Sequence, residues 1–272
     1  MKLDIINSIE QYKAIVTKYG GKDSLTNDYL QKEAQSLIDN GLLSVFEEGT
    51  NAFLFVRKDV GLRVYYYLND LNDFPEFDIQ EDLIIEILFR GDNILPQAVI
   101  DYFLECGFSK HLQRDQYSAI YKNITLSKQN IEGLSIYIAK TRDEVAYAID
   151  LFNKTFDNYT GNYIPESECD KLFSEKCILI ARFNDRLAGA MHFRREGKLI
   201  WAEHNVVEPW CRGKHIGSEL CNAFIEEAKV DENTRYTRWT QHQGQAAKMY
   251  KKMGFVYVNK SSFSMLKLKK NN

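Results

Sequence analysis

One stretch of the chain joins a basic turn to the start of a helix. Residues 206–217 read as a strand end followed by the turn Arg212-Gly213-Lys214-His215, and a helical pattern runs on over 218–230. The first backbone N–H groups of a helix have no partner within the helix, and the helix dipole adds positive potential there. The sequence therefore predicts an anion site over residues 212–218, suited to a phosphate or pyrophosphate.

A second pattern of chemical interest lies near the end of the sequence. Ala246 and Tyr250 are one helical turn apart, and Gly254-Phe255 follows as a helix C-cap with a hydrophobic contact. A phenolic hydroxyl is a proton donor, so Tyr250 is a candidate acid. A core aromatic on the same helix face is the alternative interpretation.

The basic turn resembles the pyrophosphate loop of the GNAT superfamily of acyl-CoA-dependent N-acyltransferases. Arg212 and Gly217 fit the family pattern Arg/Gln-x-x-Gly-x-Gly/Ala, and Val207 and Pro209 precede it as the family's valine and proline do. His215 departs from the pattern because it stands where the family has a glycine. Histidine adopts a positive φ more readily than most residues, and the loop must tolerate that side chain or hold the pyrophosphate slightly differently.

The second pattern resembles the family's alanine–tyrosine–glycine–phenylalanine motif, with Gln243 where an asparagine is common. Both motifs occur in the family's order, within a region of resemblance that covers roughly residues 133–268. The resemblance implies that acetyl-CoA is the acyl donor and that a primary amine of a small molecule or peptide attacks the thioester directly. It implies no covalent enzyme intermediate, and we expect no metal.

The resemblance also implies roles for individual residues. Tyr250 matches the acid that protonates the leaving thiolate, and the Val207 N–H is the expected donor to the thioester carbonyl. This contact would lie in a gap where the strand of Val207 diverges from the strand over 236–241. The residues expected to bind the cofactor are Val207, Arg212, Gly213, Lys214, His215, Ile216, Gly217, Ser218, Gln243, Ala246 and Tyr250.

Glu203 is the preferred candidate for the base that deprotonates the amine. It shares strand parity with Val207, which predicts that both face the same side of the sheet. A solvated strand carboxylate is the alternative for Glu203. His204 faces the other side of a regular strand, but a β-bulge would re-aim it, so it is the reserve candidate. Four aromatic residues are candidates to line the acceptor pocket or to pack in the core: Tyr159, Tyr163, Trp201 and Trp239.

The elements around the two motifs occur twice along the chain. Each half contains meander strands, then a further strand, then a helix closed by a Gly-Phe pair, and a last strand. The pair is Gly107-Phe108 in the first half and Gly254-Phe255 in the second. The matching order favours an internal duplication.

The two copies differ where the chemistry is expected. In place of the basic turn the first half has the acidic, glycine-free segment 69–82, and Phe103 stands where Tyr250 stands. We therefore expect the first copy to have lost anion binding and proton transfer. One acyl-CoA per chain follows from this difference.

The predicted fold class is α/β (α+β), with two tandem GNAT-like domains, each a mixed, mostly antiparallel sheet flanked by helices. The polar segment 123–133 is the expected linker. The expected domains are residues 1–125, a degenerate copy without catalytic function, and residues 131–272, an acetyltransferase domain that binds acyl-CoA.

Composition excludes several classes of function. The 272 residues are 44% hydrophobic and 27% charged with a net charge of −3, which is typical of a globular protein without a basic field for nucleic acid. No apolar run is long enough to cross a membrane, and residues 1–7 lack a signal-peptide core. Five scattered cysteines fit reduced thiols. We expect a cytoplasmic protein whose partners are acetyl-CoA and an amine, with neither nucleic acid nor membrane; the oligomeric state is not indicated.

Two other functions remain compatible with these motifs. One is an aminoacyl- or long-acyl-transferase of the same fold. The other is a non-catalytic module that senses acyl-CoA through the turn and uses the first copy to bind a partner.

Overall fold

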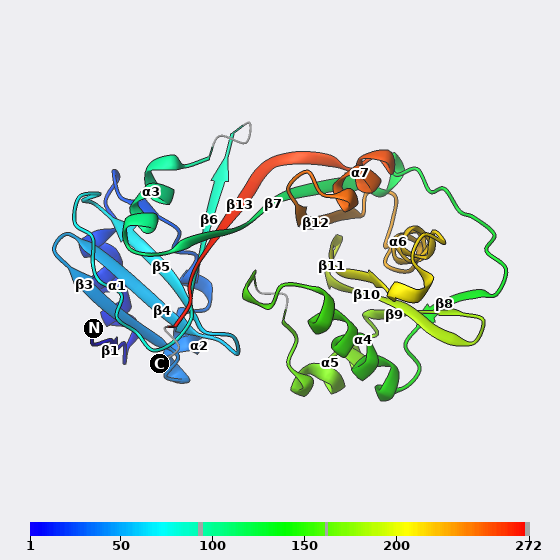
Figure 1. The fold of residues 1–272 in the computed structure, drawn as a ribbon, viewed down its shortest axis with the longest axis horizontal. Coiled ribbons are helices and arrows are strands. Elements are labelled where there is room, and N and C mark those ends of the chain that lie inside the picture. Colours follow the sequence, from blue (N-terminus) through cyan, green and yellow to red (C-terminus); the bar gives the residue numbers. More distant parts are fainter. Residues whose placement is uncertain (92–94, 161–162, 270–272) are drawn as a thin grey trace. The chain divides into compact units, whose positions relative to one another are not determined.

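The computed structural model describes residues 1–91, 95–160 and 163–269 (Figure 1). The chain divides into two compact units, Met1–Gln113 with Ser261–Asn272, and Arg114–Lys260. This division differs from the expected one at residues 125–131. The reason is that two long strands, β7 (Ser109–Ile120) and β13 (Val256–Lys267), each contribute residues to both units.

The first unit is a sheet with strand order β1-β3-β4-β5-β6-β13-β7, and β2 pairs with β5. Side chains of β4 alternate between two buried faces: Leu54 and Val56 pack with α1 and α2, whereas Phe53 and Phe55 pack with α3. Its elements besides β7 and β13 are β1 (Asp4–Ile5), α1 (Ile9–Tyr19), β2 (Leu25–Thr26), η1 (Leu30–Lys32), α2 (Ala34–Asp39), β3 (Leu43–Glu48), β4 (Asn51–Arg57), β5 (Leu62–Leu68), β6 (Leu83–Arg90) and α3 (Gln97–Glu105).

The second unit is a sheet with strand order β13-β7-β12-β11-β10-β9-β8. Helices α4 and α5 cover one face, and α6 and α7 cover the other. Its further elements are η2 (Tyr121–Asn123), β8 (Leu134–Ile138), α4 (Arg142–Thr155), η3 (Asn158–Thr160), η4 (Glu166–Glu168), α5 (Cys169–Glu175), β9 (Ile178–Phe183), β10 (Arg186–Glu196), β11 (Leu199–Val207), η5 (Pro209–Cys211), α6 (Ile216–Glu227), β12 (Arg235–Gln241) and α7 (Gln245–Lys252).

Both units contain the same divergent pair of parallel strands. In the first unit β5 pairs with β6 only from Leu62↔Leu83 to Val64↔Ile85. In the second, β11 pairs with β12 only from Leu199↔Arg235 to Trp201↔Thr237. Two parallel strands that part after three pairs leave backbone N–H and C=O groups on their facing edges, so each unit has a gap where another extended chain can pair.

Both units also close the following helix in the same way. The Phe108 N–H donates to the Phe103 carbonyl at 2.9 Å, and the Phe255 N–H donates to the Tyr250 carbonyl at 3.0 Å. The glycine before each phenylalanine has a positive φ, as this cap requires. The matching strands and caps support the duplication that the sequence indicated.

The units differ after their third meander strand. β11 leads through η5 into α6, whereas β5 leads into the segment 69–82, which contains no helix. The first unit therefore lacks a helix N-terminus at this place. Among the helices of the described ranges, none has the length and apolar character needed to cross a bilayer.

Candidate functional site

The predicted anion site lies at an exposed turn that ends in the N-terminus of α6. Arg212, Gly213, Lys214 and His215 are exposed, whereas Ile216 is buried and fixes the helix start in the core. The Arg212 Nε donates to the Val207 carbonyl at 3.1 Å. The turn is therefore tied to the end of β11 while its cations remain open to solvent.

His215 is the N-cap of α6 and has left-handed backbone angles, φ 61° and ψ 7°. Its carbonyl accepts from the N–H groups of Ser218 at 3.0 Å and Glu219 at 3.1 Å. The residue that departs from the family pattern thus adopts the conformation for which a glycine is usual. Gly213 also has a positive φ, at 79°.

Val207 is the last residue of β11, and the edge of β11 that faces β12 is unpaired there. It pairs opposite Gly189 of β10, and the Glu208 N–H donates to the Ala188 carbonyl at 2.8 Å. In an antiparallel ladder this alternation directs the N–H and C=O of Val207 away from β10, toward the side of β12. β12 has already diverged there, so the Val207 N–H points into the gap.

Tyr250 of α7 is buried, with 1% of its surface exposed. Its hydroxyl lies 2.9 Å from the Cys221 Sγ of α6, and its ring packs edge-on against Phe255. The Arg238 guanidinium lies 3.8 Å from the ring centroid. Helices α6 and α7 and strand β12 therefore converge on this phenol.

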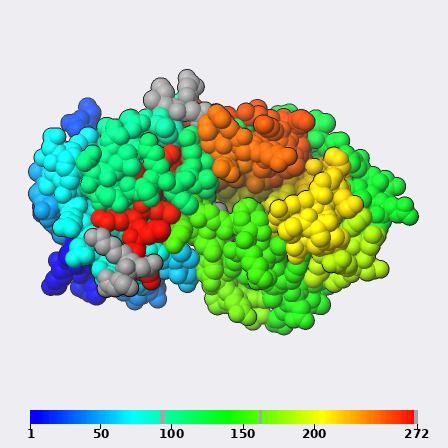
Figure 2. Space-filling view, in the orientation of Figure 1, coloured from blue at the N-terminus to red at the C-terminus, as the bar shows by residue number. Residues whose placement is uncertain are grey.

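The remaining predicted cofactor residues line the outside of the same helices. Gln243 is exposed in the turn before α7 with φ 54°, and Ala246 is exposed on the first turn of α7. The Ser218 hydroxyl lies 3.7 Å from the Met249 Sδ, which joins α6 to α7. Gly217 packs beneath Val207, because a Cβ placed on it would lie 3.4 Å from the Val207 Cγ2. Figure 2 shows the yellow and orange atoms of this part of the chain at the surface.

β11 contains a β-bulge at Glu203, so strand parity alone does not determine which face this side chain occupies, and its shared face with Val207 stays a prediction. Ala202 is opposite Phe193 and His204 is opposite His192, so Glu203 is the extra residue. Ala202 and Val207 pack in the α6 core, whereas Val206 packs in the α4 core. Glu203 is therefore not fixed to the face of Val207 by alternation.

Both base candidates lie by the bulge. Glu203 accepts from the Arg194 Nε at 3.3 Å, and its side chain is 32% exposed. His204 is buried and stacks on Phe152 of α4 at 4.8 Å between ring centroids. His204 therefore faces α4, on the side of the sheet opposite to Val207.

His204 also contacts a second histidine. The Nδ1 atoms of His192 and His204 are 3.3 Å apart, and their rings are nearly parallel. Burial lowers the pKa of His192 to about 3, with the neighbouring His204 adding to the shift. His192 is therefore neutral at pH 7.

Sequence reasoning missed two residues beside the gap, Arg238 and Asn205. Arg238 is the first residue of β12 after its last pair with β11 and is 7% exposed; its Nε and Nη1 have no hydrogen-bond partner in the part of the chain that the structure describes. Asn205 donates to the Gly217 carbonyl and the Cys221 Sγ, both at 3.0 Å, while its Oδ1 is buried and unpartnered within the same residues. The sequence signal that could have found Arg238 is its spacing. It follows Tyr236 by two residues in a strand, so it faces the same side as this buried aromatic.

The equivalent gap of the first unit is filled by the chain itself. The Asn27 side chain donates to the Glu86 carbonyl of β6 at 2.9 Å and accepts from the Tyr66 N–H of β5 at 2.8 Å. Thr26 of β2 pairs with Tyr67, whose other edge already pairs with β4. β2 therefore occupies the edge of β5 that faces β6.

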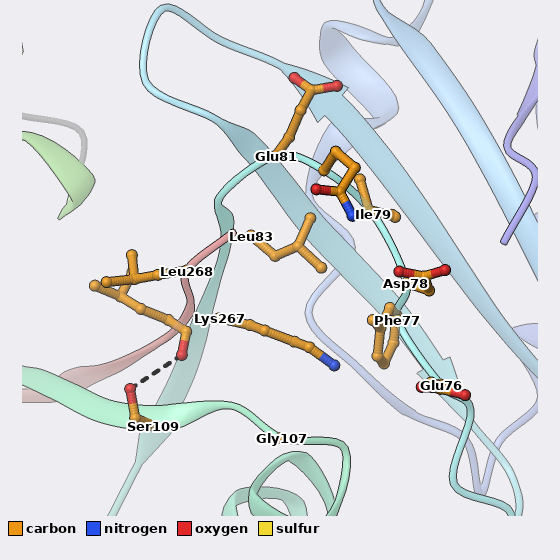
Figure 3. A pocket seen from close by; sticks show the side chains of 12 residues that line it. Glu76, Phe77, Asp78, Ile79, Glu81, Leu83, Gly107, Ser109, Lys267 and Leu268 are labelled. Carbon is orange, nitrogen blue, oxygen red and sulfur yellow. Dashed lines mark hydrogen bonds between the residues drawn. The ribbon is translucent and has the colours of Figure 1, made fainter. Parts of the chain in front are cut away.

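A cavity of about 310 Å³ lies in the first unit beside the segment 69–82 (Figure 3). Three carboxylates line it, Glu76, Asp78 and Glu81, together with Lys267, whose Nζ donates to the Cys106 carbonyl at 3.0 Å. The excess of negative charge opposes binding of a pyrophosphate.

The aromatic candidates for an acceptor pocket come from separate elements. Trp201 is on β11, where its Nε1 donates to Glu196 at 3.1 Å, and Trp239 is on β12 with Arg114 over its ring. Tyr159 is in η3, and Tyr163 is exposed; Gly161 and Asn162 between them lie outside the described residues. These four stay predictions.

Residues 174–257 match the family model of the acetyltransferase (GNAT) domain. Among solved structures, a GCN5-related N-acetyltransferase from Kribbella flavida is 11% identical, with a TM-score of 0.52 over 85% of this chain and 92% of that chain. A tandem GNAT protein from the clavulanic acid biosynthesis pathway is 10% identical, with a TM-score of 0.53 over 85% and 84%.

A Drosophila protein is 12% identical, with a TM-score of 0.56 over 98% of this chain and 99% of that chain. Identities this low show likeness of fold. No curated protein sequence matches the chain.

Proposed function

We propose that the second unit is an N-acyltransferase, because residues 174–257 match the acetyltransferase (GNAT) domain and the chain has the fold of a tandem GNAT protein. It moves an acetyl or other acyl group from acyl-CoA to a primary amine. The first unit is a non-catalytic copy.

The open edge of β11 carries this proposal. Beyond Trp201 the strand no longer pairs with β12, and the Val207 N–H points into the gap between the two strands. The pantetheine of acyl-CoA, an extended chain with amide groups, suits such an edge. The exposed turn at 212–218 lies at the end of the same strand and suits the pyrophosphate.

The proposed reaction needs no covalent enzyme intermediate. The amine nitrogen attacks the thioester carbonyl, a C–N bond forms, and the C–S bond breaks. The Val207 N–H donates to the carbonyl oxygen as negative charge develops on it. Tyr250 gives its proton to the departing thiolate, and the base takes a proton from the attacking nitrogen, so that an amide and the free thiol of CoA result.

Glu203 is the base that the geometry favours. Its carboxylate is partly exposed and can pass a proton to solvent, whereas His204 is enclosed by aromatic rings and His192. The electrostatic interaction of Glu203 with Arg238 of β12 supports a base close to the diverging strands. His204 stays in reserve.

Two substitutions test the proposal. Arg212→Ala removes the cation that is bonded to the end of β11, so we expect weaker binding of acetyl-CoA by calorimetry. Tyr250→Phe keeps the ring packing and removes the acid, so we expect unchanged binding and a rate of CoA thiol release reduced by ~10²–10⁴-fold across a panel of amines.

The exposed Arg235, replaced by alanine, is the control for loss of a positive charge. Unchanged binding in Arg212→Ala together with an unchanged rate in Tyr250→Phe contradicts the assignment. Binding of acetyl-CoA without thiol release under any amine instead identifies an acyl-CoA sensor.

A further inference from the structure

Arg238 is a buried cation that forms no ion pair with the residues that the structure describes. Its guanidinium is enclosed by β12, α6 and α7, and both Nε and Nη1 lack a hydrogen-bond partner among the residues that the structure describes. Burial lowers the pKa of Arg238 to about 10, so the group is still charged at pH 7. An unpaired buried charge is strongly unfavourable, and one in a native protein calls for an explanation.

The ionisable groups that face Arg238 do not supply the missing charge. Cys221 on α6 has its pKa raised by burial to about 11, so it is a neutral thiol at pH 7. Tyr250 on α7 presents its ring face to the guanidinium. Glu203 on β11 interacts with Arg238 through space, but its carboxylate pairs with Arg194 at 3.3 Å.

The place of Arg238 along the gap indicates which part of a ligand it meets. The turn at 212–218 lies beyond Val207, at the open end, and Arg238 follows the last paired residue, Thr237, at the closed end. A chain of contacts connects Asn205 to Arg238. The Asn205 Nδ2 lies 3.0 Å from the Cys221 Sγ, which lies 2.9 Å from the Tyr250 hydroxyl. The Arg238 guanidinium lies 3.8 Å from the centroid of the Tyr250 ring. Asn205 and Val207 are two residues apart on one strand, or about 7 Å. An acyl-CoA whose thioester lies at Val207 therefore extends its acyl group toward Arg238.

We propose that Arg238 binds a carboxylate on the acyl group, so that the preferred donor is the CoA thioester of a dicarboxylic acid. This inference rests on the proposed acyl-CoA function and refines its donor. The carboxylate accepts hydrogen bonds from the unpartnered N–H groups of Arg238 and takes no part in the bonds that break and form. A neutral acetyl group leaves the charge of Arg238 uncompensated.

Calorimetric binding of four thioesters tests this, without knowledge of the acceptor: acetyl-CoA, butyryl-CoA, malonyl-CoA and succinyl-CoA. A charge-assisted hydrogen bond contributes about 1.5–3 kcal/mol, which converts to ~10–100-fold in affinity. We expect malonyl-CoA or succinyl-CoA to bind the native protein tighter than butyryl-CoA by that factor. Butyryl-CoA controls for acyl length.

Arg238→Met keeps an unbranched, flexible side chain and removes its charge. We expect the preference for a carboxylate to disappear while acetyl-CoA binds within ~3-fold of the native protein, and Arg238→Lys to restore part of the preference. Arg235→Met, the same change at an exposed position of β12, leaves the preference intact. A melting temperature of Arg238→Met at or above the native value is expected, because an apolar residue replaces an unpaired buried charge.

Two results overturn the inference. One is equal affinity of the native protein for thioesters with charged and with neutral acyl groups, and the other is a preference for the carboxylate that survives in Arg238→Met. If no thioester binds at all, the proposed function itself fails.

Discussion

His215 shows how one residue can depart from a family pattern and keep its geometry. At φ 61° and ψ 7° its Cβ is crowded by the backbone, a cost of roughly 1–2 kcal/mol for a residue other than glycine. The turn retains that conformation because the His215 carbonyl caps the first turn of α6. The sequence position that seemed weakest for anion binding therefore presents an ordinary helix start.

Comparison of glycine and alanine at position 215 tests this account. Both substitutions remove the imidazole, but only glycine relieves the positive φ, so we expect His215→Gly to be more stable than His215→Ala by about 1 kcal/mol in urea unfolding. Lys214, which has no positive φ, is the matched control, and there alanine should be the more stable. Equal stability of the two variants at 215 contradicts a backbone cause.

The bulge at Glu203 marks the limit of residue-level prediction. The motifs Arg212–Gly217 and Ala246–Phe255 were found from sequence because each depends on local turn and cap chemistry. The β-bulge beside Glu203 was not predicted, because an extra residue in β11 becomes visible only in its pairing with β10. Arg238 was missed for a related reason. An arginine in a strand is expected to be exposed, and only the structure shows that this one is enclosed where the strands diverge.

At the scale of elements, the two gaps differ in what occupies them. In the first unit Asn27 joins the diverging strands β5 and β6, and β2 pairs along the edge of β5. In the second, the Asn205 Oδ1 and the Arg238 Nε and Nη1 have no hydrogen-bond partner in the described ranges. The sequence predicted loss of function in the first copy from segment 69–82, but the filling of its gap depends on a residue about forty positions from β5.

Asn27→Ala tests the filling of the first gap. The change removes the acceptor of the buried Tyr66 N–H and a donor to the Glu86 carbonyl, which should lower the free energy of unfolding by about 1–3 kcal/mol. Affinity for acetyl-CoA, measured where the variant is folded, should stay within ~2-fold, at one molecule per chain. Exposed Asn72→Ala is the control, with a change of about 0.5 kcal/mol or less. A second bound acetyl-CoA per chain in Asn27→Ala shows instead that the first gap is a masked cofactor site.

At the scale of the whole molecule, each unit includes strand residues from the other half of the sequence. Residues 114–120 of β7 pair with all of β12, from Arg235↔Ile120 to Gln241↔Arg114. Tyr117 and Ala119 enter the core with α6 and α7. Sequence patterns predicted the fold class and the strands, but a strand pattern does not say which edge the strand joins. The structural division between Gln113 and Arg114 therefore differs from the expected boundary near residue 125.

Two fragments separate the sequence-based domain boundary from the structural one. Fragment 131–272 lacks residues 114–120 and exposes the edge of β12, together with the core that Tyr117 and Ala119 cover, so we expect it to aggregate or unfold. Fragment 114–260 keeps that pairing, and we expect a cooperative thermal transition and binding of acetyl-CoA. Light scattering, circular dichroism and calorimetry provide the comparison. A folded monomer of 131–272 that binds acetyl-CoA, beside an unfolded 114–260, would show that β7 is dispensable to the second unit and that the boundary lies where the sequence placed it.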